Sequence, residues 1–145
     1  MNRRKFLATG CISCLSGGLM LSLLESCSST RIINAAIADS DMIVPLKHFL
    51  AAGKKDYKKY IVVQNDILQY PICIYRFDDN TYKALLMKCT HQGAELQVFG
   101  DKLQCPAHGS EFNNHGGIES GPAAAPLRSL PVMVDNDQLK ISLKA

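Results

Sequence analysis

The chain has 145 residues, of which 47% are hydrophobic and 20% charged, and its formal net charge is +3. This length fits one modest globular domain and excludes a large enzyme with separate cofactor and substrate domains. The charge falls short of the strongly basic footprint of a nucleic-acid-binding protein, so no nucleic acid partner is expected. The six cysteines fit either a disulfide-rich secreted scaffold or a metal site, and only their spacing separates these two classes.

Residues 1–26 have the parts of a secretory signal peptide, with a charged head, an apolar body and a small-residue end. The head contains Arg3, Arg4 and Lys5, and the apolar run extends from Ala8 to Leu24. This run is short for a membrane-spanning helix, which needs about 20 residues, although an uncleaved signal anchor is the alternative. The paired arginines resemble a twin-arginine export signal, whose route carries proteins already folded around a cofactor.

The signal ends in Leu24-Glu25-Ser26-Cys27, which resembles a bacterial lipobox. In such a sequence the cysteine becomes the lipidated first residue of the mature chain, whereas a plain signal cut nearby is the alternative. Either reading places the mature protein outside the cytoplasm, on the periplasmic side of a bacterial membrane, and the first tethers it through lipid at Cys27. Removing residues 1–26 takes away three basic residues and one acidic residue, which lowers the net charge from +3 to +1.

Residues 27–41 lack clear periodicity and are expected to form a tether, and the folded domain is expected to span residues 42–145. Within it the sequence predicts short strands separated by Asp, Asn and Gly turn residues. The expected strands are Met42–Leu46, Tyr60–Gln64, Ile72–Phe77, Thr81–Met87, Leu96–Phe99, Leu130–Val134 and Leu139–Leu143. One helix is expected, over Leu46–Lys59, with Gly53 interrupting it. Many short strands predict an all-β fold, a small antiparallel β-sandwich.

Two loops each offer one thiol and one imidazole. One reads Cys89-Thr90-His91-Gln92-Gly93, and the other reads Cys105-Pro106-Ala107-His108-Gly109-Ser110. Residues two apart in extended backbone point to the same side, and a proline after a cysteine favours a tight turn in which residues three apart converge. The loops therefore supply two sulfur and two nitrogen ligands.

The glycines of these loops, Gly93 and Gly109, can take positive φ, which lets backbone amides approach an inorganic sulfide. A disulfide between Cys89 and Cys105 is an alternative, but it leaves the histidines unexplained. A structural zinc site is the second alternative, because two cysteines and two histidines are also a tetrahedral zinc set. Zinc modules group Cys with Cys and His with His, whereas each loop here mixes the two ligand types.

The two loops resemble the binding boxes of Rieske iron–sulfur proteins: Cys-Thr-His at 89–91 and Cys-Pro-Ala-His-Gly-Ser at 105–110, with thirteen residues between them. The later Gly121-Pro122-Ala123 and Pro126-Leu127 resemble the proline loop that covers the cluster in that family. The resemblance spans roughly residues 42–143. It implies a small all-β domain of Rieske type with the two cluster-binding loops at one tip.

The same resemblance implies that the cofactor is a 2Fe-2S cluster. Cys89 and Cys105 would hold one iron, and His91 and His108 would hold the other. The formal charges of two ferric ions, two sulfides and two thiolates cancel, so an electron enters a neutral centre. Such centres therefore span about −150 to +300 mV, against about −400 mV for plant-type clusters.

Departures from the family pattern bear on the reduction potential. Ala94 and Ala107 stand where quinol–cytochrome c reductase subunits carry a disulfide, so that clamp is absent. Ser110 stands where a serine hydroxyl donates to a bridging sulfide in high-potential members. Phe112 replaces a tyrosine whose hydroxyl donates to a ligand sulfur. One tuning donor is kept and one lost, which predicts a potential between the ferredoxin-like and the high-potential members.

The sequence thus predicts one-electron transfer by an exported, membrane-tethered protein with a redox partner. The alternative is the iron–sulfur subunit of a periplasmic oxidoreductase, resembling the small subunit of arsenite oxidase or the Rieske subunit of quinol–cytochrome c reductase. The partner would accordingly be a cytochrome, a molybdoenzyme or a quinol-oxidising complex. No nucleophile–base pair is evident, so an electron carrier or subunit is favoured over a stand-alone enzyme. Of the other cysteines, Cys11 and Cys14 belong to the signal, and Cys73 is expected to be a buried apolar thiol.

Overall fold

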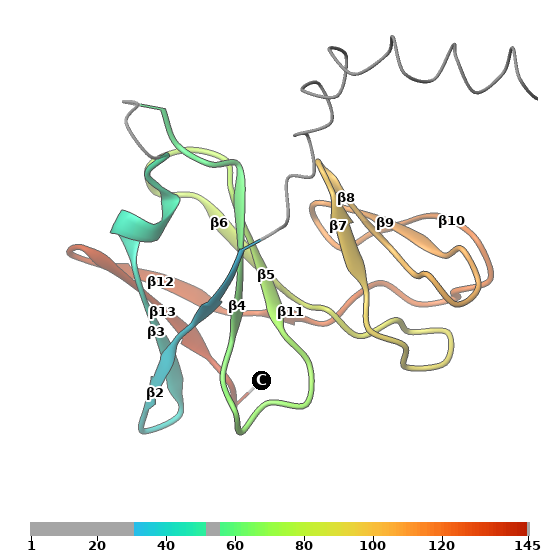
Figure 1. Ribbon diagram of the computed structural model, residues 1–145, viewed down its shortest axis with the longest axis horizontal. Coiled ribbons are helices and arrows are strands. Elements are labelled where there is room, and N and C mark those ends of the chain that lie inside the picture. Colours follow the sequence, from blue (N-terminus) through green and yellow to red (C-terminus); the bar gives the residue numbers. More distant parts are fainter. Residues whose placement is uncertain (1–30, 52–55, 145) are drawn as a thin grey trace, which may run out of the picture.

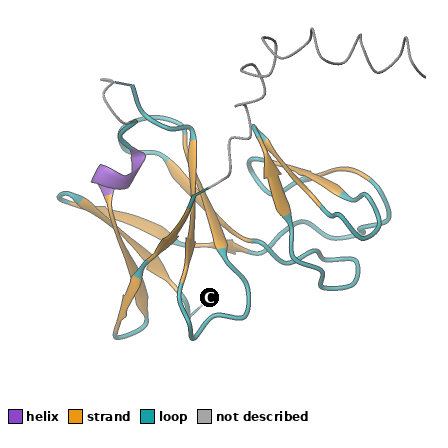
Figure 2. Ribbon diagram, viewed as in Figure 1, coloured by secondary structure: helices purple, strands orange, loops and turns teal. Residues whose placement is uncertain are grey.

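The structure is a computed structural model that describes residues 31–51 and 56–144. The expected signal peptide and Cys27 therefore lie outside the described residues. Within the described part, no helix is both long and apolar enough to cross a bilayer. Strands dominate, and a single turn of 3-10 helix, η1 (Leu46–Phe49), is the helical element there (Figure 2).

The strands form three sheets, which lie beside one another in Figure 1. The first sheet has the order β1-β4-β5-β6-β11, the second β12-β13-β3-β2, and the third β10-β9-β8-β7. Their bounds are β1 (Ile32–Asn34), β2 (Ala36–Ala38), β3 (Asp41–Pro45), β4 (Tyr60–Gln64), β5 (Ile72–Arg76), β6 (Tyr82–Leu86), β7 (Gln97–Phe99), β8 (Lys102–Gln104), β9 (Glu111–Asn113), β10 (Ile118–Ser120), β11 (Ser129–Leu130), β12 (Val132–Asp135) and β13 (Gln138–Ser142). The strands pair antiparallel throughout the described sheets, except that β1 runs parallel to β4.

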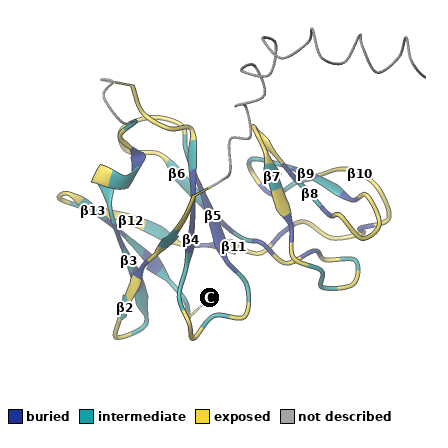
Figure 3. Cartoon of the chain, in the orientation of Figure 1, coloured by how far each residue is buried: buried dark blue, intermediate teal, exposed yellow. Residues whose placement is uncertain are grey.

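The first sheet is the middle layer, because its central strands are buried on both faces (Figure 3). Successive residues of a strand point to opposite faces. One face packs with the second sheet, and this base core includes Ile61, Val63, Ile72, Ile74, Ala84, Val44 and Leu139. The other face packs with the third sheet, and this site core includes Val62, Cys73, Tyr75, Leu85, Leu103 and Phe112. The expected all-β antiparallel fold is confirmed, with a third layer added to the sandwich.

The expected tether over residues 27–41 is wrong for its described part, which forms β1 and β2 and begins β3. Ile33 and Ile37 pack against the base core, and Ala35 between them is 5% exposed. Backbone pairing of β1 with β4 and of β2 with β3 fixes the segment. The alternation of apolar side chains at 33, 35 and 37 is a strand pattern, and it brings the start of the domain forward.

The helix expected over Leu46–Lys59 is also wrong for the described residues beyond its first turn, 50–51 and 56–59. After η1 the chain is extended at Leu50, which forms an antiparallel bridge with Tyr57. The backbone N–H of Lys58 donates to the carbonyl of Phe49, at 2.7 Å. Hydrogen bonds across this reversal replace those that would have continued a helix, and the buried Phe49 ring anchors the turn.

Candidate metal centre

Three loops meet at one end of the third sheet. The first box (Cys89–Ala94) follows β6, and the second box (Cys105–Ser110) joins β8 to β9. The proline loop (Gly121–Leu127) follows β10 and runs back toward β11. The first box and the proline loop therefore connect the first and third sheets, whereas the second box lies within the third sheet (Figure 1).

The two boxes have the same backbone hydrogen bonds. In the first box the N–H of Cys89 donates to the carbonyl of Ala94, and the N–H of Gly93 donates to the carbonyl of Cys89, both at 2.8 Å. The second box repeats these bonds at the equivalent positions, at 2.8 and 3.0 Å. Gly93 and Gly109 have φ values of 77° and 73°, a region that residues other than glycine rarely adopt. Each box is therefore a closed turn with its cysteine at the start.

Both cysteines point inward. Cys89 is 1% exposed and Cys105 is 3% exposed, and both belong to the site core. Burial acts to raise the pKa of the Cys105 thiol, but the backbone N–H groups of His108 and Ala107, together with the Cys89 side chain, outweigh it, so the pKa lies below its usual value. Hydrogen bonds to a sulfur favour its thiolate form. Both thiols are free, so the disulfide considered from the sequence is not formed.

The two imidazoles face each other at the outer side of the boxes. The ring centroids of His91 and His108 are 5.0 Å apart, and the rings are nearly perpendicular. His108 is exposed and His91 is half-buried. The Nδ1 atom of His91 is buried and has no hydrogen-bond partner. Buried polar nitrogen atoms nearly always have a partner, so this atom is the kind that a metal ion satisfies.

These residues fit a 2Fe-2S cluster. Two thiols in contact and two facing imidazoles are soft sulfur and nitrogen donors of the type that iron–sulfur centres use. Within residues 31–51 and 56–144, no three His, Cys, Asp or Glu side chains form a set around a single metal ion. A dinuclear cluster with mixed ligation needs two protein ligands at each iron, which is the two-and-two grouping found here.

The proline loop is bound to both boxes by side chains. The Oγ1 of Thr90 donates to the carbonyl of Ala125 at 2.6 Å, and the N–H of Ala123 donates to the Oγ of Ser110 at 3.2 Å. Gly121 approaches so closely that a Cβ there would lie 2.5 Å from the Cα of Ser110. The sequence singled out this loop as a cover, but it assigned no role to Thr90, which lies between two expected ligands.

Of the residues expected to tune the cluster, Ser110 ends the second box and Phe112 follows it on β9. Ser110 and Phe112 are each fully buried, with 0% exposure. Ala94 is half-buried and Ala107 is exposed.

Tyr70 contacts Gly93 of the first box. The sequence did not indicate this contact, because the two residues are 23 positions apart. The Tyr70 hydroxyl donates to the Gly93 carbonyl at 2.7 Å.

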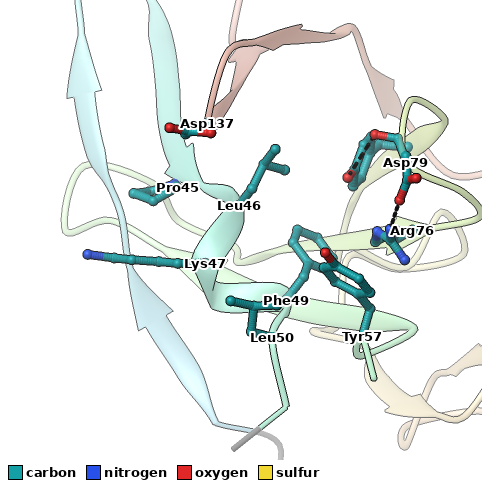
Figure 4. A pocket seen from close by; sticks show the side chains of 10 residues that line it. Pro45, Leu46, Lys47, Phe49, Leu50, Tyr57, Arg76, Asp79 and Asp137 are labelled. Atoms are coloured by element: carbon teal, nitrogen blue, oxygen red, sulfur yellow. Dashed lines mark hydrogen bonds and ion pairs between the residues drawn. The ribbon is translucent and has the colours of Figure 1, made fainter. Parts of the chain in front are cut away.

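A cavity of about 540 Å³ lies elsewhere, beside η1 and the β5–β6 turn (Figure 4). Its apolar wall includes Phe49 and Leu50, and the Arg76 guanidinium lies 3.8 Å from the centre of the Tyr57 ring. None of its lining residues belongs to either box or to the proline loop. The cavity therefore plays no part in the candidate metal centre.

Comparison with known proteins supports the assignment of a 2Fe-2S cluster to this protein. The cytochrome b6-f complex iron-sulfur subunit 2 of Nostoc sp. is 30% identical over 95 residues, which cover 64% of this chain and 47% of that protein. The corresponding subunit of Chlorobaculum tepidum is 24% identical over 130 residues, which cover 77% of this chain and 69% of that protein. The chain thus spans about half the length of several of the curated relatives it matches.

Solved structures show the same fold. The plasma membrane Rieske protein from Synechocystis PCC 6803 has a TM-score of 0.51 and 24% identity, covering 59% of this chain and 87% of its own. The ferredoxin of carbazole 1,9a-dioxygenase from Nocardioides aromaticivorans has a TM-score of 0.51 and 19% identity, covering 72% and 99%. The family model of the Rieske [2Fe-2S] domain matches residues 47–131, more than half of the chain. The chain therefore belongs to the Rieske family, whose cofactor is a 2Fe-2S cluster.

Proposed function

We propose that Cys89, Cys105, His91 and His108 hold the 2Fe-2S cluster through which this protein carries out Rieske-type electron transfer. The observation that carries the assignment is the pairing of the ligands: two buried thiols in contact, and two imidazoles whose centroids are 5.0 Å apart, on boxes with identical backbone hydrogen bonds. When bound, the cluster accepts and returns one electron at a time.

The cysteine side and the histidine side of this site differ in their exposure to solvent. The thiols face the site core, where water is excluded, and the amides of Ala107 and His108 stabilise negative charge on Cys105. The His108 ring is exposed, so the histidine side is the part of the site that a partner can approach most closely. Electrons would therefore enter and leave through the histidine side.

The partner is a redox protein, and two arrangements are open. A free carrier would exchange electrons with several proteins, such as a cytochrome or a molybdoenzyme. The second candidate is the iron–sulfur subunit of a periplasmic oxidoreductase, either one that resembles arsenite oxidase or a quinol-oxidising complex. The similarity to cytochrome b6-f iron–sulfur subunits favours the quinol-oxidising complex. Stable co-purification with a molybdenum or cytochrome subunit would establish the second arrangement, and a monomer that reduces several cytochromes would establish the first.

Export and tethering rest on the sequence of residues 1–27. The twin-arginine-like head suits a protein that folds around its cluster before transport, and Cys27 suits a lipid anchor. Fractionation of cells that express the full chain tests this placement. We expect the wild-type protein in the membrane fraction and Cys27→Ser in the soluble periplasmic fraction; a cytoplasmic wild-type protein would contradict it.

Redox titration of the purified protein, followed by EPR, tests the cluster. We expect about two irons per chain and, on reduction, the low-average-g signal of mixed cysteine and histidine ligation. Cys105→Ala and His108→Ala should lose the signal. Cys73→Ala and His115→Ala are matched controls outside the boxes and should keep it. A colourless, EPR-silent protein with one zinc ion would overturn the assignment in favour of the structural zinc module.

A further inference from the structure

The two boxes are supported unequally by the sheets. The second box joins two paired strands, β8 and β9, whose adjoining residues Gln104 and Glu111 are in register. The first box is flanked by one isolated bridge, between Lys88 and Glu95, and by the bond from the Leu96 N–H to the Met87 carbonyl. The first box therefore needs a further contact to hold it as firmly as the second.

Tyr70 supplies that contact from the opposite layer. It lies in the loop between β4 and β5 of the first sheet, and its side chain is partly buried. Its hydroxyl donates to the carbonyl of Gly93 at 2.7 Å, a typical distance for an O–H···O hydrogen bond. The Nζ of Lys88 lies 5.4 Å from the centre of the Tyr70 ring, within the range of a cation–π interaction.

The surroundings of Gly93 show how closely this contact fits. A Cβ at that position would lie 3.4 Å from the Cε of Lys88 and 3.7 Å from the hydroxyl of Tyr70. These are ordinary contact distances, so the positive φ of Gly93, and not crowding, is what favours glycine at this position. The three residues form one wall of the first box.

We propose that Tyr70 is a positioning residue that fixes the first box and raises the reduction potential of the cluster bound there, an inference that rests on the proposed function. Its hydroxyl donates to the carbonyl of the Gly93–Ala94 peptide, which polarises that peptide and strengthens the Ala94 N–H as a donor. A field of backbone donors around a cluster stabilises its reduced, more negative state. Tyr70 thus supplies a donor group at the first box, whereas Phe112 supplies none at the second.

Tyr70→Phe tests the inference, because it removes the hydroxyl and keeps the ring beside Lys88. We expect full iron content, a midpoint potential below that of the wild-type protein, and severalfold faster amide hydrogen exchange at Gly93 and Cys89. Tyr82→Phe is the matched control. It also removes a phenol that donates to a backbone carbonyl, that of Asp79 at 3.3 Å, but at the opposite end of β6 from the first box. Its midpoint potential and its exchange rates in the first box should equal those of the wild-type protein.

A Tyr70→Phe protein with the wild-type midpoint potential would overturn the inference, even if amide exchange became faster. Equal shifts in Tyr70→Phe and Tyr82→Phe would also overturn it, since the effect would not belong to the first box. Failure of the proposed function gives a different result: the wild-type protein itself would show no cluster signal. In that case unchanged amide exchange in Tyr70→Phe would still overturn the positioning role, and faster exchange would support it.

Discussion

Gly121 shows how one residue type lets the proline loop contact the second box. Its φ is 91°, and a Cβ there would lie 2.5 Å from the Cα of Ser110 and 2.8 Å from the carbonyl oxygen of Gly109. These neighbours are backbone atoms, which cannot swing aside as a flexible side chain can. Only glycine brings the two loops this close.

We therefore expect Gly121→Ala to lose stability and to release its cluster more readily. Gly100→Ala is the control, because Gly100 also has a positive φ, of 60°, but its Cβ would meet nothing within 4 Å. Both variants bear the cost of placing alanine at a positive φ. Because of the clash, the free energy of unfolding of Gly121→Ala should be about 1–3 kcal/mol lower than that of Gly100→Ala. Thermal unfolding followed by circular dichroism measures the difference. Equal losses of stability in the two variants would show that the proline loop can move away from the second box at no energetic cost.

Ser110 combines two roles in one fully buried hydroxyl. Its oxygen accepts the N–H of Ala123, which leaves its own proton free to donate. We expect Ser110→Ala to lower the free energy of unfolding by about 1–3 kcal/mol, because the buried N–H of Ala123 loses its acceptor. The midpoint potential should also fall, since a donor near the cluster is lost. Ser129→Ala, an exposed serine on β11, is the control for both measurements. An unchanged potential in Ser110→Ala would remove this residue from the tuning set.

At the scale of elements, the proline loop ties the boxes together in place of the disulfide that Ala94 and Ala107 exclude. We expect Thr90→Val to weaken this tie, because it keeps the side-chain shape and removes the donor to Ala125. The cost in stability should be about 0.5–1.5 kcal/mol, but iron loss to a chelator should be faster. Thr81→Val is the matched control, because its hydroxyl bonds Asp78 in the β5–β6 turn, away from the boxes. If both variants lose iron at the wild-type rate, the loop is held by other contacts.

The sequence predicted the strands that have a strong apolar alternation or a continuous apolar run. Tyr60–Gln64 is a strand with the predicted bounds, and β5 and β6 lie within the predicted ranges. β9 (Glu111–Asn113) and β10 (Ile118–Ser120) were missed, because each is a short strand in which polar residues outnumber the single apolar one. Backbone pairing holds both strands, and the buried Phe112 also anchors β9. The run expected over Leu130–Val134 is divided by Pro131, which has no N–H for a ladder. The chain passes there from the first sheet to the second.

The two boxes could be predicted from the spacing of cysteine and histidine within each of them, because that spacing is local. The contacts between loops were not, since Tyr70 and Gly93, or Thr90 and Ala125, are brought together by the packing of whole sheets. No local pattern in a single sequence marks such pairs.

At the scale of the whole molecule, the middle layer buries groups that ionise at high pH. Cys73, the thiol expected to be buried, is 0% exposed in the site core. Burial raises the pKa of its thiol from 9.0 to about 12, against a smaller opposing effect of the neighbouring Tyr75 hydroxyl. The pKa of Tyr75 is also raised, chiefly by burial and then by Cys73. In alkaline solution, both groups therefore stay neutral in the folded protein at pH values at which they have already lost their protons in the unfolded chain.

This difference makes the folded state less stable as the solution becomes alkaline. Above pH 9 the unfolded chain releases the Cys73 proton and the folded protein keeps it until about pH 12, so each rise in pH favours unfolding. For this one group, the free energy of unfolding should fall by about 1.4 kcal/mol between about pH 8 and about pH 10. The chain has no Trp, so urea unfolding should be followed by far-ultraviolet circular dichroism.

Cys73→Ala is the variant that isolates this effect. It should lower stability at pH 8 through lost packing, but its stability should fall less steeply toward pH 10 than that of the wild-type protein, because the titrating thiol is gone. Tyr75 contributes mainly above its ordinary range near pH 10, so the comparison below that pH reports on Cys73. Parallel curves for the two proteins would mean that the Cys73 thiol titrates alike in the folded and unfolded states. The thiol would then reach solvent through the middle layer, which its complete burial there does not allow.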